Sequence, residues 1–434
     1  MATRVRAEWD RLRRLAVHRP GMEMWLGLLA PRASLYERAF SRYEARREHE
    51  RLEYALTHEF KVEVVRLKEK LLELADRKPE VREKLIALAL RDLKYAGNPN
   101  RVDQAQKQLK DSLPLLDSGQ FFYMLIFHPE LELEEEEGAR AVDVRVTARQ
   151  PLTNLYFMRD QQATTDRGIF LSRMSKPQRR EEPIITRFLW ESLGETIVHE
   201  TEAPGTFEGG DFMPMKDFAL LGLGDRTNAS GVRQFLEHGL GFKEVALVHQ
   251  PAHPLIPGDE PDRMVTMHLD TYFNVAGSGV AVGSETLLKR AAVEIYYREG
   301  KGVFKKQRER ATNLHDYIRS KGFSIIDLTT LEQLSDASNF LCIKDGTILA
   351  VEVDRQAKNV LESLSYQAKQ HPNRYGRLLD QAQKDYQHLK ETGGFFPHKR
   401  EIYHHGIDAF PITLTNLTGG YGGPHCMTAI LERG

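Results

Sequence analysis

The stretch Asp211-Phe-Met-Pro-Met-Lys-Asp-Phe-Ala-Leu-Leu-Gly222 contains two short apolar runs with a tight turn between them. Its halves, Asp211–Met215 and Phe218–Gly222, are separated by Lys-Asp only, which is typical of a β-hairpin. An amphipathic helix is predicted near residues 229–239, and a further strand follows at Val245–His249. The stretch therefore predicts one ββαβ unit.

Units of the same kind recur along the chain at intervals of roughly fifty to seventy residues. Other turns of the hairpin type lie at Thr165-Asp166-Arg167, Gly277-Ser278-Gly279 and Lys344-Asp345-Gly346. The flanking apolar runs predict strands at Gln161–Thr164, Gly168–Ser172, Tyr272–Val275, Val280–Val282, Ser324–Leu328, Phe340–Ile343, Thr347–Val351 and Ile412–Asn416. Further helices are predicted near residues 181–193, 285–298 and 306–320. A doubly wound sheet alternates single strands with helices, so this regularity instead favours repeated ββαβ units around an axis.

The two ends of the chain also contain predicted strands. At the N-terminal end, strands are predicted at Leu12–Arg19 and Val62–Val65, with a helix over residues 34–58 between them. At the C-terminal end, Met427, Ala429, Ile430 and Leu431 predict a strand that begins just after a cysteine.

Between the N-terminal strands and the repeats, the chain changes character. Leucine and alanine recur at helical spacing among charged residues, and Asn98-Pro99-Asn100 interrupts them. We expect a helical insertion over residues 66–128, within a single domain formed by residues 1–434.

Composition excludes several classes of protein. Hydrophobic residues make up 41% of the 434, which is enough for a substantial core. The 61 basic and 62 acidic residues leave a net charge of −1, a balance that argues against binding of the nucleic-acid backbone. No signal peptide and no apolar run of membrane-span length is visible. We therefore expect a soluble, cytoplasmic protein without nucleic-acid or membrane partners.

Some conspicuous residues have structural explanations. Two cysteines in a chain of this length do not form a disulfide framework, which favours a reducing compartment. Of these two, Cys342 lies inside an apolar run and is predicted to be a buried structural thiol. The acidic run Glu134–Glu137 and the basic run Lys305–Arg310 are predicted to be solvated surfaces.

Polar residues interrupt the apolar pattern at several strand ends, where they are informative. In His268-Leu269-Asp270, a period of two places both polar side chains on the same face of a strand. In the last cluster, Cys426 follows the glycine-rich segment Gly419-Gly420-Tyr421-Gly422-Gly423. Each cluster alone is also explained by a turn or a helix cap, as with Asp211 after two glycines or Asn228 before a helix.

Together these clusters supply one thiol, one imidazole, several carboxylates and arginines. A cysteine with a distant histidine and a carboxylate is a recognised arrangement for nucleophilic catalysis. Carboxylates beside a thiol raise its pKa and suppress the thiolate. The combination therefore points to a cationic substrate, which would neutralise the carboxylates and promote thiolate formation when it binds.

With these clusters in place, the sequence resembles the arginine deiminases, of the guanidino-group-modifying superfamily. The resemblance covers essentially the whole chain and rests on motifs in the same order, which are Asn154…Asp160, Glu208-Gly-Gly-Asp211, Gly224-Asp-Arg226, Met267-His-Leu-Asp270 and Gly422-Gly-Pro-His-Cys426-Met. It implies an α/β fold in which ββαβ units form a five-bladed propeller around a central site, the pentein fold. It also implies hydrolysis of L-arginine to L-citrulline and ammonia.

The resemblance assigns catalytic roles residue by residue. Cys426 would attack the guanidinium carbon, and His268 would protonate the departing ammonia and then activate water against a covalent thiouronium intermediate. Asp160 and Asp270 would hold guanidinium N–H groups in charge-assisted hydrogen bonds and fix the carbon against the thiol. Glu208 would orient His268 and favour its charged form.

The resemblance also implies a set of substrate-binding residues, which are Asn154, Phe157, Arg179, Arg226, Asp211 and Tyr421. The two arginines match positions that hold the substrate carboxylate, and neither a metal nor an organic cofactor is implied. Many members have an arginine in place of Tyr421. Tyrosine supplies no fixed positive charge, so loop closure or substrate choice is expected to differ here.

Other functions stay open at this point. An arginine dihydrolase would carry hydrolysis on to ornithine, and a related enzyme would act on another guanidino compound. A zinc hydrolase would use ligands chosen from His268, Asp270, Asp211, His425 and Cys426. A binding module without catalysis would have no need for a thiol, an imidazole and carboxylates together. Members of the resembling family are commonly dimeric or tetrameric, so we expect a homodimer or homotetramer.

Overall fold

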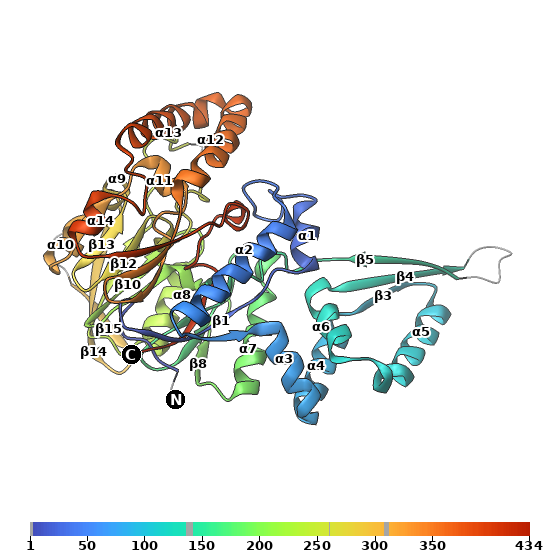
Figure 1. Ribbon diagram of the computed structural model, residues 1–434. Helices are drawn as coiled ribbons and strands as arrows, with labels where there is room; N and C mark the ends of the chain where they lie inside the picture. Colours follow the sequence, from blue (N-terminus) through green and yellow to red (C-terminus); the bar gives the residue numbers. More distant parts are fainter. Residues whose placement is uncertain (1–2, 136–141, 260, 308–311) are drawn as a thin grey trace.

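Five groups of three strands in the body of the molecule share one pattern of pairing in the computed structural model (Figure 1), which describes residues 3–135, 142–259, 261–307 and 312–434. A sixth group, outside the body, has the same pattern and is described below. In each group the middle strand pairs antiparallel with one neighbour and parallel with the other. Three groups are β6 (Gln162–Thr164), β7 (Ile169–Leu171) and β8 (Ile197–Glu200); β9 (Phe212–Met215), β10 (Phe218–Leu223) and β11 (Glu244–His249); and β12 (Phe273–Gly277), β13 (Val280–Gly283) and β17 (Ser324–Asp327). The other two are β18 (Leu341–Lys344), β19 (Thr347–Val351) and β20 (Asp408–Ile412), and β21 (Ala429–Arg433), β1 (Leu12–Val17) and β2 (Glu63–Arg66). The last group therefore joins the two ends of the chain.

The predicted hairpins are confirmed, since the four predicted turns connect β6 to β7, β9 to β10, β12 to β13, and β18 to β19. The predicted strand Ile412–Asn416 is wrong, because β20 ends at Ile412. Beyond it, the backbone N–H groups of Asn416 and Leu417 donate to the carboxylate of Glu48 instead of to a neighbouring strand.

The predicted helices are correct in two places and misplaced in others. The confirmed ones are α7 (Glu182–Leu193) and α8 (Ala229–Gln234), which a π-helical turn extends to Gly239. The N-terminal helix α2 (Arg42–Tyr54) begins later than predicted, because Ser41 caps it by accepting from the Glu44 N–H. It follows a short helix, α1 (Met22–Leu28).

The helix predicted over residues 285–298 is wrong. Only α9 (Glu285–Leu288) is helical, and β14 (Ala292–Gly300) follows and pairs with β11, β15 (Val303–Lys306) and β16 (Thr312–Asn313). Branched and aromatic side chains in Val-Glu-Ile-Tyr-Tyr suit a pleated sheet better than a helix. Likewise the helix predicted near residues 306–320 is restricted to α10 (Leu314–Ser320), which Asn313 caps.

The segment expected to be a helical insertion contains α3 (Leu67–Arg77), α4 (Pro79–Asp92), α5 (Pro99–Ser112) and α6 (Ser118–Phe127). It also contains a strand that the helical pattern concealed, β3 (Lys94–Gly97), which pairs with β4 (Pro129–Glu135). This strand pairs in turn with β5 (Val142–Ala148). Figure 1 shows these three strands and α5 extending away from the body as an arm.

A continuous core fixes the base of this arm to the body. Leu71 of α3, Leu85 of α4 and Phe121 of α6 lie in one buried cluster with Phe188 of α7. Burial of such a side chain contributes roughly 1.5–3 kcal/mol. Helices α11 (Thr330–Leu334), α12 (Val353–Gln370) and α13 (Pro372–Thr392) pack on one another at another end of the molecule (Figure 1), and α14 (Arg400–His404) precedes β20.

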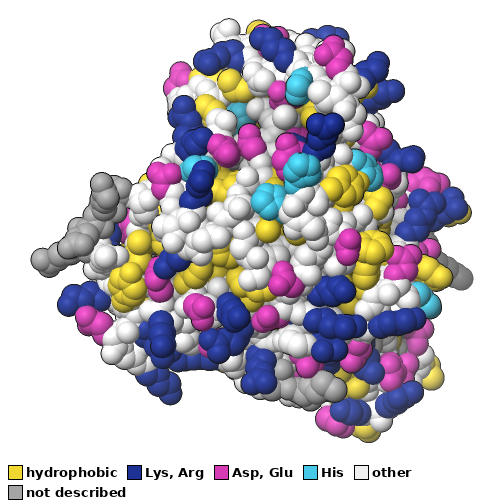
Figure 2. Space-filling model, turned by 60° about the vertical axis from the view of Figure 1, so that its left-hand side comes forward, with side chains coloured by type: hydrophobic (Ala, Val, Ile, Leu, Met, Phe, Trp, Pro, Cys, Tyr) yellow, Lys and Arg dark blue, Asp and Glu magenta, His cyan; other side chains and the backbone are white. Residues whose placement is uncertain are grey.

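Basic and acidic side chains are interspersed on the face shown in Figure 2. In the predicted solvated runs, Glu134, Lys305 and Lys306 are exposed, whereas residues 136–137 and 308–310 lie outside the described part of the chain. Cys342 is buried in β18 as predicted, and burial raises the pKa of its thiol to about 12. No helix in the described part of the chain combines the length and apolar composition that a membrane span requires.

Candidate active site

A single turn precedes the first strand of each strand group, and each of these turns carries one polar residue of interest. Three are short 3₁₀ turns, Met158–Gln161, Gly209–Asp211 and Leu269–Thr271, and the other two lie before β18 and β21. The residues are Asp160, Asp211, Asp270, Asn339 and Cys426. The prediction that His268 and Asp270 lie on a strand is therefore wrong, because the chain makes a 3₁₀ turn there and β12 starts only at Phe273.

Eight of the predicted site residues line one narrow cavity, and they are Asn154, Phe157, Asp160, Arg179, Arg226, His268, Tyr421 and Cys426. Leu35, Met264, Met267 and Gly420 complete its wall. The free volume is about 20 Å³, which is about what one water molecule needs. Of the remaining predictions, Glu208 and Asp270 contact the lining residues from behind, and Asp211 lies further away.

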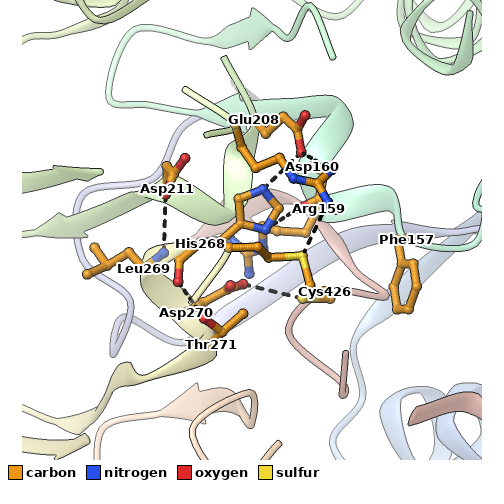
Figure 3. Close-up of polar contacts among 12 residues, drawn as sticks. Phe157, Arg159, Asp160, Glu208, Asp211, His268, Leu269, Asp270, Thr271 and Cys426 are labelled. Atoms are coloured by element: carbon orange, nitrogen blue, oxygen red, sulfur yellow. Dashed lines mark hydrogen bonds and ion pairs between the residues drawn. The ribbon is translucent and has the colours of Figure 1, made fainter. Parts of the chain in front are cut away.

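The thiol of Cys426 lies in a fully buried polar environment (Figure 3). Its Sγ lies 3.5 Å from Oδ2 of Asp270 and 3.0 Å from Nδ2 of Asn339, which donates to it. The Oδ1 of Asn339 accepts from the backbone N–H groups of Cys426 and Gly423, at 3.0 and 2.8 Å. One side chain therefore fixes both the backbone and the sulfur of the cysteine.

Burial raises the pKa of the Cys426 thiol well above its ordinary value, and the charges of Asp270 and Asp160 raise it further. The hydrogen bond from Asn339 acts in the opposite direction. The thiol therefore keeps its proton at neutral pH unless a positive charge enters the cavity.

His268 lies between carboxylates on the other side of the cavity (Figure 3). Its Nε2 lies 2.9 Å from Oε2 of Glu208, and its Nδ1 lies 3.6 Å from Oδ1 of Asp160. Burial disfavours the charged imidazolium, but the charge of Asp160 and the hydrogen bond with Glu208 outweigh this effect and raise the pKa to about 9. The imidazole is therefore protonated at neutral pH and is able to act as an acid.

Glu208 is held in its ionised form. Burial opposes its charge, but Arg226, with Nη1 at 3.5 Å, and His268 lower its pKa well below the ordinary value. Its second oxygen accepts from the Ser175 N–H at 2.9 Å. Glu208 thus both orients the imidazole and stabilises its positive charge.

Arg179 is bound entirely by groups of the protein. Its Nη1 donates to Oδ2 of Asp160 at 2.6 Å, its Nη2 donates to the Phe157 carbonyl at 3.0 Å, and Glu182 accepts from Nε and Nη2. Its predicted role in holding a substrate carboxylate therefore competes with three partners that are already in place.

Arg226 retains more capacity to bind a ligand. Its buried Nε has no hydrogen-bond partner among the described residues, and lies 3.9 Å from Oδ2 of Asp225. Its Nη2 faces only the sulfur atoms of Met264 and Met267, at 3.3 and 3.8 Å, which are weak acceptors. An anion that reaches this part of the cavity would find unsatisfied N–H donors.

Asp160 and Asp270 each have one buried oxygen that accepts no hydrogen bond, although that of Asp160 lies 3.6 Å from Nδ1 of His268. The Oδ1 atoms of both residues have no hydrogen-bond partner in the described structure. The other oxygen of Asp270 accepts from Nδ1 of His425 at 2.8 Å, and that contact lowers the pKa of Asp270 against the effect of burial. The two carboxyl groups therefore present acceptors to this region, which suits a ligand with several N–H donors.

Asp211 occupies a different place from the one its predicted binding role requires. Its Oδ1 accepts from the Leu269 N–H at 3.2 Å and from Gln250 at 2.6 Å, and it is not among the residues that line the cavity (Figure 3). Burial raises its pKa to about 6. It holds the turn between His268 and Asp270 in position.

The glycine-rich loop closes the cavity by close approach. A side chain at Gly420 would collide with the Tyr156 hydroxyl, and one at Gly422 would meet the Phe157 ring and the cysteine. Between them, Tyr421 has a φ of +67° and a ψ of 49°. For a residue other than glycine this left-handed conformation costs roughly 1–2 kcal/mol.

Sequence analysis missed Asn339, Glu182 and the contact of His425 with Asp270. Asn339 precedes the first strand of the fourth group, at the position that Asp160, Asp211 and Asp270 occupy in the first three. An alignment of the repeats to one another would have marked it. Glu182 had no such signal, since a glutamate at the start of an exposed-looking helix is ordinary.

The predicted zinc ligands are not gathered into one cluster. Among the described residues, two groups have ligand atoms close enough for one metal ion, Asp160 with Glu208 and His268, and Asp92 with His128 and Glu181. Neither group contains the cysteine or Asp211. The first group is already satisfied by ion pairs of the imidazole with its neighbours.

Comparison with known proteins adds to this geometry. A family model described as arginine deiminase matches residues 33–433. An arginine deiminase from Halobacterium salinarum is 27% identical over 502 aligned residues, covering 98% of this chain and 96% of the relative. Arginine deiminase 1 from Staphylococcus epidermidis is 24% identical and covers 99% and 98%. Among solved structures, an amidinotransferase from Microseira wollei gives a TM-score of 0.49 at 11% identity (99% and 97% covered). A dimethylarginine dimethylaminohydrolase gives 0.48 at 14% (96% and 99% covered).

Proposed function

Because the chain belongs to the arginine deiminase family, we propose that it hydrolyses L-arginine to L-citrulline and ammonia. The observation that carries this proposal is that Cys426, His268 and Asp160 line one cavity, with Asp270 3.5 Å from the sulfur and with Oδ1 of both aspartates lacking a hydrogen-bond partner among the described residues. A guanidinium group would satisfy both oxygens and place its carbon beside the sulfur.

The first half of the reaction replaces ammonia by sulfur. The positive charge of the bound guanidinium offsets the carboxylates, so the Cys426 thiol releases its proton to solvent. The sulfur then bonds to the guanidinium carbon as the electron pair of the C=N bond moves to nitrogen. His268 donates its proton to the departing nitrogen as the C–N bond breaks. Ammonia leaves, and the carbon stays bound to the sulfur as a thiouronium.

The second half returns the enzyme to its starting state. The neutral imidazole of His268 removes a proton from a water molecule as its oxygen bonds to the thiouronium carbon. The C–S bond then breaks as the added hydroxyl loses its proton and becomes the carbonyl of citrulline, and the departing thiolate takes up a proton to restore the Cys426 thiol. Glu208 stabilises the imidazolium that forms again, which explains why its carboxylate is buried beside the ring.

The other end of the substrate would be held by different residues. Arg226 has an N–H group without a hydrogen-bond partner, so we assign the substrate carboxylate to this residue. Asn154 lines the same cavity, but its amide N–H groups donate to the Ser34 carbonyl and to Oγ1 of Thr153. Phe157 and Tyr421 would enclose the aliphatic stem. Arg179 would keep its hydrogen bond to Oδ2 of Asp160 and so act mainly by orienting that carboxylate.

Architecture and assembly are part of the same proposal. We infer that the five strand groups stand around one axis as the blades of a pentein propeller, with residues 66–128 inserted into a single catalytic domain. The family membership also supports a cytoplasmic homodimer or homotetramer.

The test is a product analysis. We expect the purified protein to convert L-arginine into citrulline with one equivalent of ammonia, and Cys426→Ala to form none. Ornithine with two equivalents of ammonia would replace this proposal by a dihydrolase, and citrulline formation by the alanine variant would contradict the mechanism. The variant should match the parent in circular dichroism, which controls for folding.

A further inference from the structure

A second cavity adjoins the catalytic one, and we call it the antechamber. The two cavities share Met264, Met267 and Tyr421 in their walls. Its free volume is about 50 Å³, larger than that of the catalytic cavity. Residues of α11, α12 and α13 form much of its wall, at the end of the molecule where Figure 1 shows these helices together.

The charged residue types that line the antechamber are all acidic. Glu37, Asp262 and Asp336 are carboxylates, and the described lining residues include no lysine, arginine or histidine. Asp262 accepts from the Tyr375 hydroxyl at 2.7 Å, Asp336 accepts from Gln356 at 3.3 Å, and Glu37 pairs with Arg38 outside the wall. An anion is therefore disfavoured in this space, and a cation is favoured.

Gln333 supplies an independent indication of the ligand. This side chain is 4% exposed, and its Nε2 donates to the carbonyls of Val265 and Thr271, each at 3.0 Å. These two acceptors fix the orientation of the amide, so its Oε1 is left as a buried acceptor without a partner among the described residues. An unsatisfied buried acceptor costs roughly 1–3 kcal/mol. A ligand with N–H donors would remove that cost.

The rest of the wall is apolar. Leu334, Val360, Leu364 and Leu378 line the antechamber beside the acceptors. Burial raises the pKa of both Glu37 and Asp336, so a cation that enters stabilises carboxylates that are otherwise costly to ionise. The space thus suits a positively charged head with several N–H donors on a short aliphatic stem.

We propose that the antechamber is a second binding site for an alkylguanidinium or alkylammonium cation, separated from the catalytic cavity by Tyr421. Only the identification of that cation with the substrate rests on the proposed function. On that basis, the guanidinium end of L-arginine enters the antechamber before it reaches the thiol. The left-handed backbone at Tyr421 stores conformational strain at the dividing wall.

The variant that tests this is Asp336→Asn. Asp336 has a φ of +59°, and asparagine tolerates this conformation well, so the change removes the charge with little effect on the backbone. The matched control is Asp380→Asn, which removes an exposed carboxylate from the outer face of α13. Glu37→Gln, in another segment of the wall, provides a second test if the first variant folds poorly.

Binding is measured by calorimetry on the full chain carrying Cys426→Ala, which prevents turnover. We expect L-arginine to bind at two sites per chain and n-butylammonium at one. Asp336→Asn should weaken the second L-arginine site and the amine site at least about tenfold, whereas Asp380→Asn should leave both unchanged. Amine binding without a second L-arginine site would assign the antechamber to another amine.

A single L-arginine site with no amine binding would overturn the proposal, as would two sites that Asp336→Asn leaves unchanged. Kinetics of the active protein separate this outcome from failure of the proposed function. If Asp336→Asn forms citrulline with an unchanged KM, the proposal of a second binding site is rejected and the proposed deiminase activity is retained. If ligand binding depends on Asp336 but the active protein forms no citrulline, the second binding site is retained and the proposed deiminase activity is rejected.

Discussion

The two sides of the catalytic cavity contain different ionisable groups in the same electrostatic field. Cys426 lies beside Asp270, and His268 lies between Glu208 and Asp160. Negative charge raises the pKa of both groups, but for the thiol this suppresses the reactive form, whereas for the imidazole it supplies the acid. In the proposed mechanism, one set of carboxylates would therefore serve both halves of the reaction.

The difference also assigns a role to the substrate. The imidazole is charged before anything binds, but the thiol becomes reactive only when a cation offsets its carboxylate neighbours. A neutral compound that fits the cavity would leave the sulfur protonated. Selectivity for guanidinium over neutral ureas, such as the product, therefore follows from the field as well as from hydrogen bonding.

The largest effect should come from His268→Asn, which removes the acid without changing the size of the side chain much. We expect kcat to fall by about 10²–10⁴-fold, the usual contribution of a general acid–base group. The measurement is the initial rate of citrulline formation. Alkylation of Cys426 by iodoacetamide, a neutral reagent, should continue in this variant, which shows that the thiol side is intact; a loss of both activities would mean a collapsed site.

Asp270→Asn should have opposite effects on the reactivity of the thiol and on the rate of citrulline formation. Removal of the charge 3.5 Å from the sulfur lowers the thiol pKa, so alkylation at neutral pH should accelerate by about tenfold. Citrulline formation should still fall by about a hundredfold, because the guanidinium loses one of its charged partners.

The matched control is Glu208→Gln, which removes a carboxylate from the imidazole side. It should slow citrulline formation while leaving the alkylation rate within about twofold of the parent protein. Equal alkylation rates in Asp270→Asn and Glu208→Gln would show that the carboxylates on both sides of the cavity affect the thiol pKa equally.

How much of this site was predictable depends on whether a residue lies within a motif. Cys426, His268 and Asp160 occur in short motifs beside glycines and strand ends, and the structure brings them to one cavity. Glu182 lies at the start of a regular helix, and its role comes only from the arginine that it binds across one turn. Such a contact depends on three-dimensional packing that a local pattern does not encode.

The fold shows the same division. Hairpins with tight turns were predictable because the turn residues and the period of two are local. The segment Ala292–Gly300 resembled a helix because its charged residues fall at helical spacing, and pairing with β11 decided the outcome. The pairing of β21 with β1 joins the two ends of the chain, and no local pattern indicates a contact of that range.

Asn339→Asp should have a smaller effect, confined to the thiol side. The carboxylate would still accept from the N–H groups of Cys426 and Gly423, but it would not donate to the sulfur and would add a negative charge. Alkylation at pH 8 should therefore slow by about tenfold. Asn339→Ser, which keeps a donor, should recover part of the rate; no difference between the two would contradict a role for the donor.

The smallest effect concerns stability. The folded-state pKa of His268 is raised to about 9 from an ordinary value near 6.5, so its charge stabilises the folded protein fully below about pH 6.5. That contribution is lost as the pH rises through about 9. Urea unfolding at pH 7.5 and pH 9.5 should therefore show a larger loss of stability in the parent protein than in His268→Asn. The high pKa of the Cys426 thiol is common to both proteins and cancels in this comparison, so parallel losses would mean that the imidazole is neutral in the folded state.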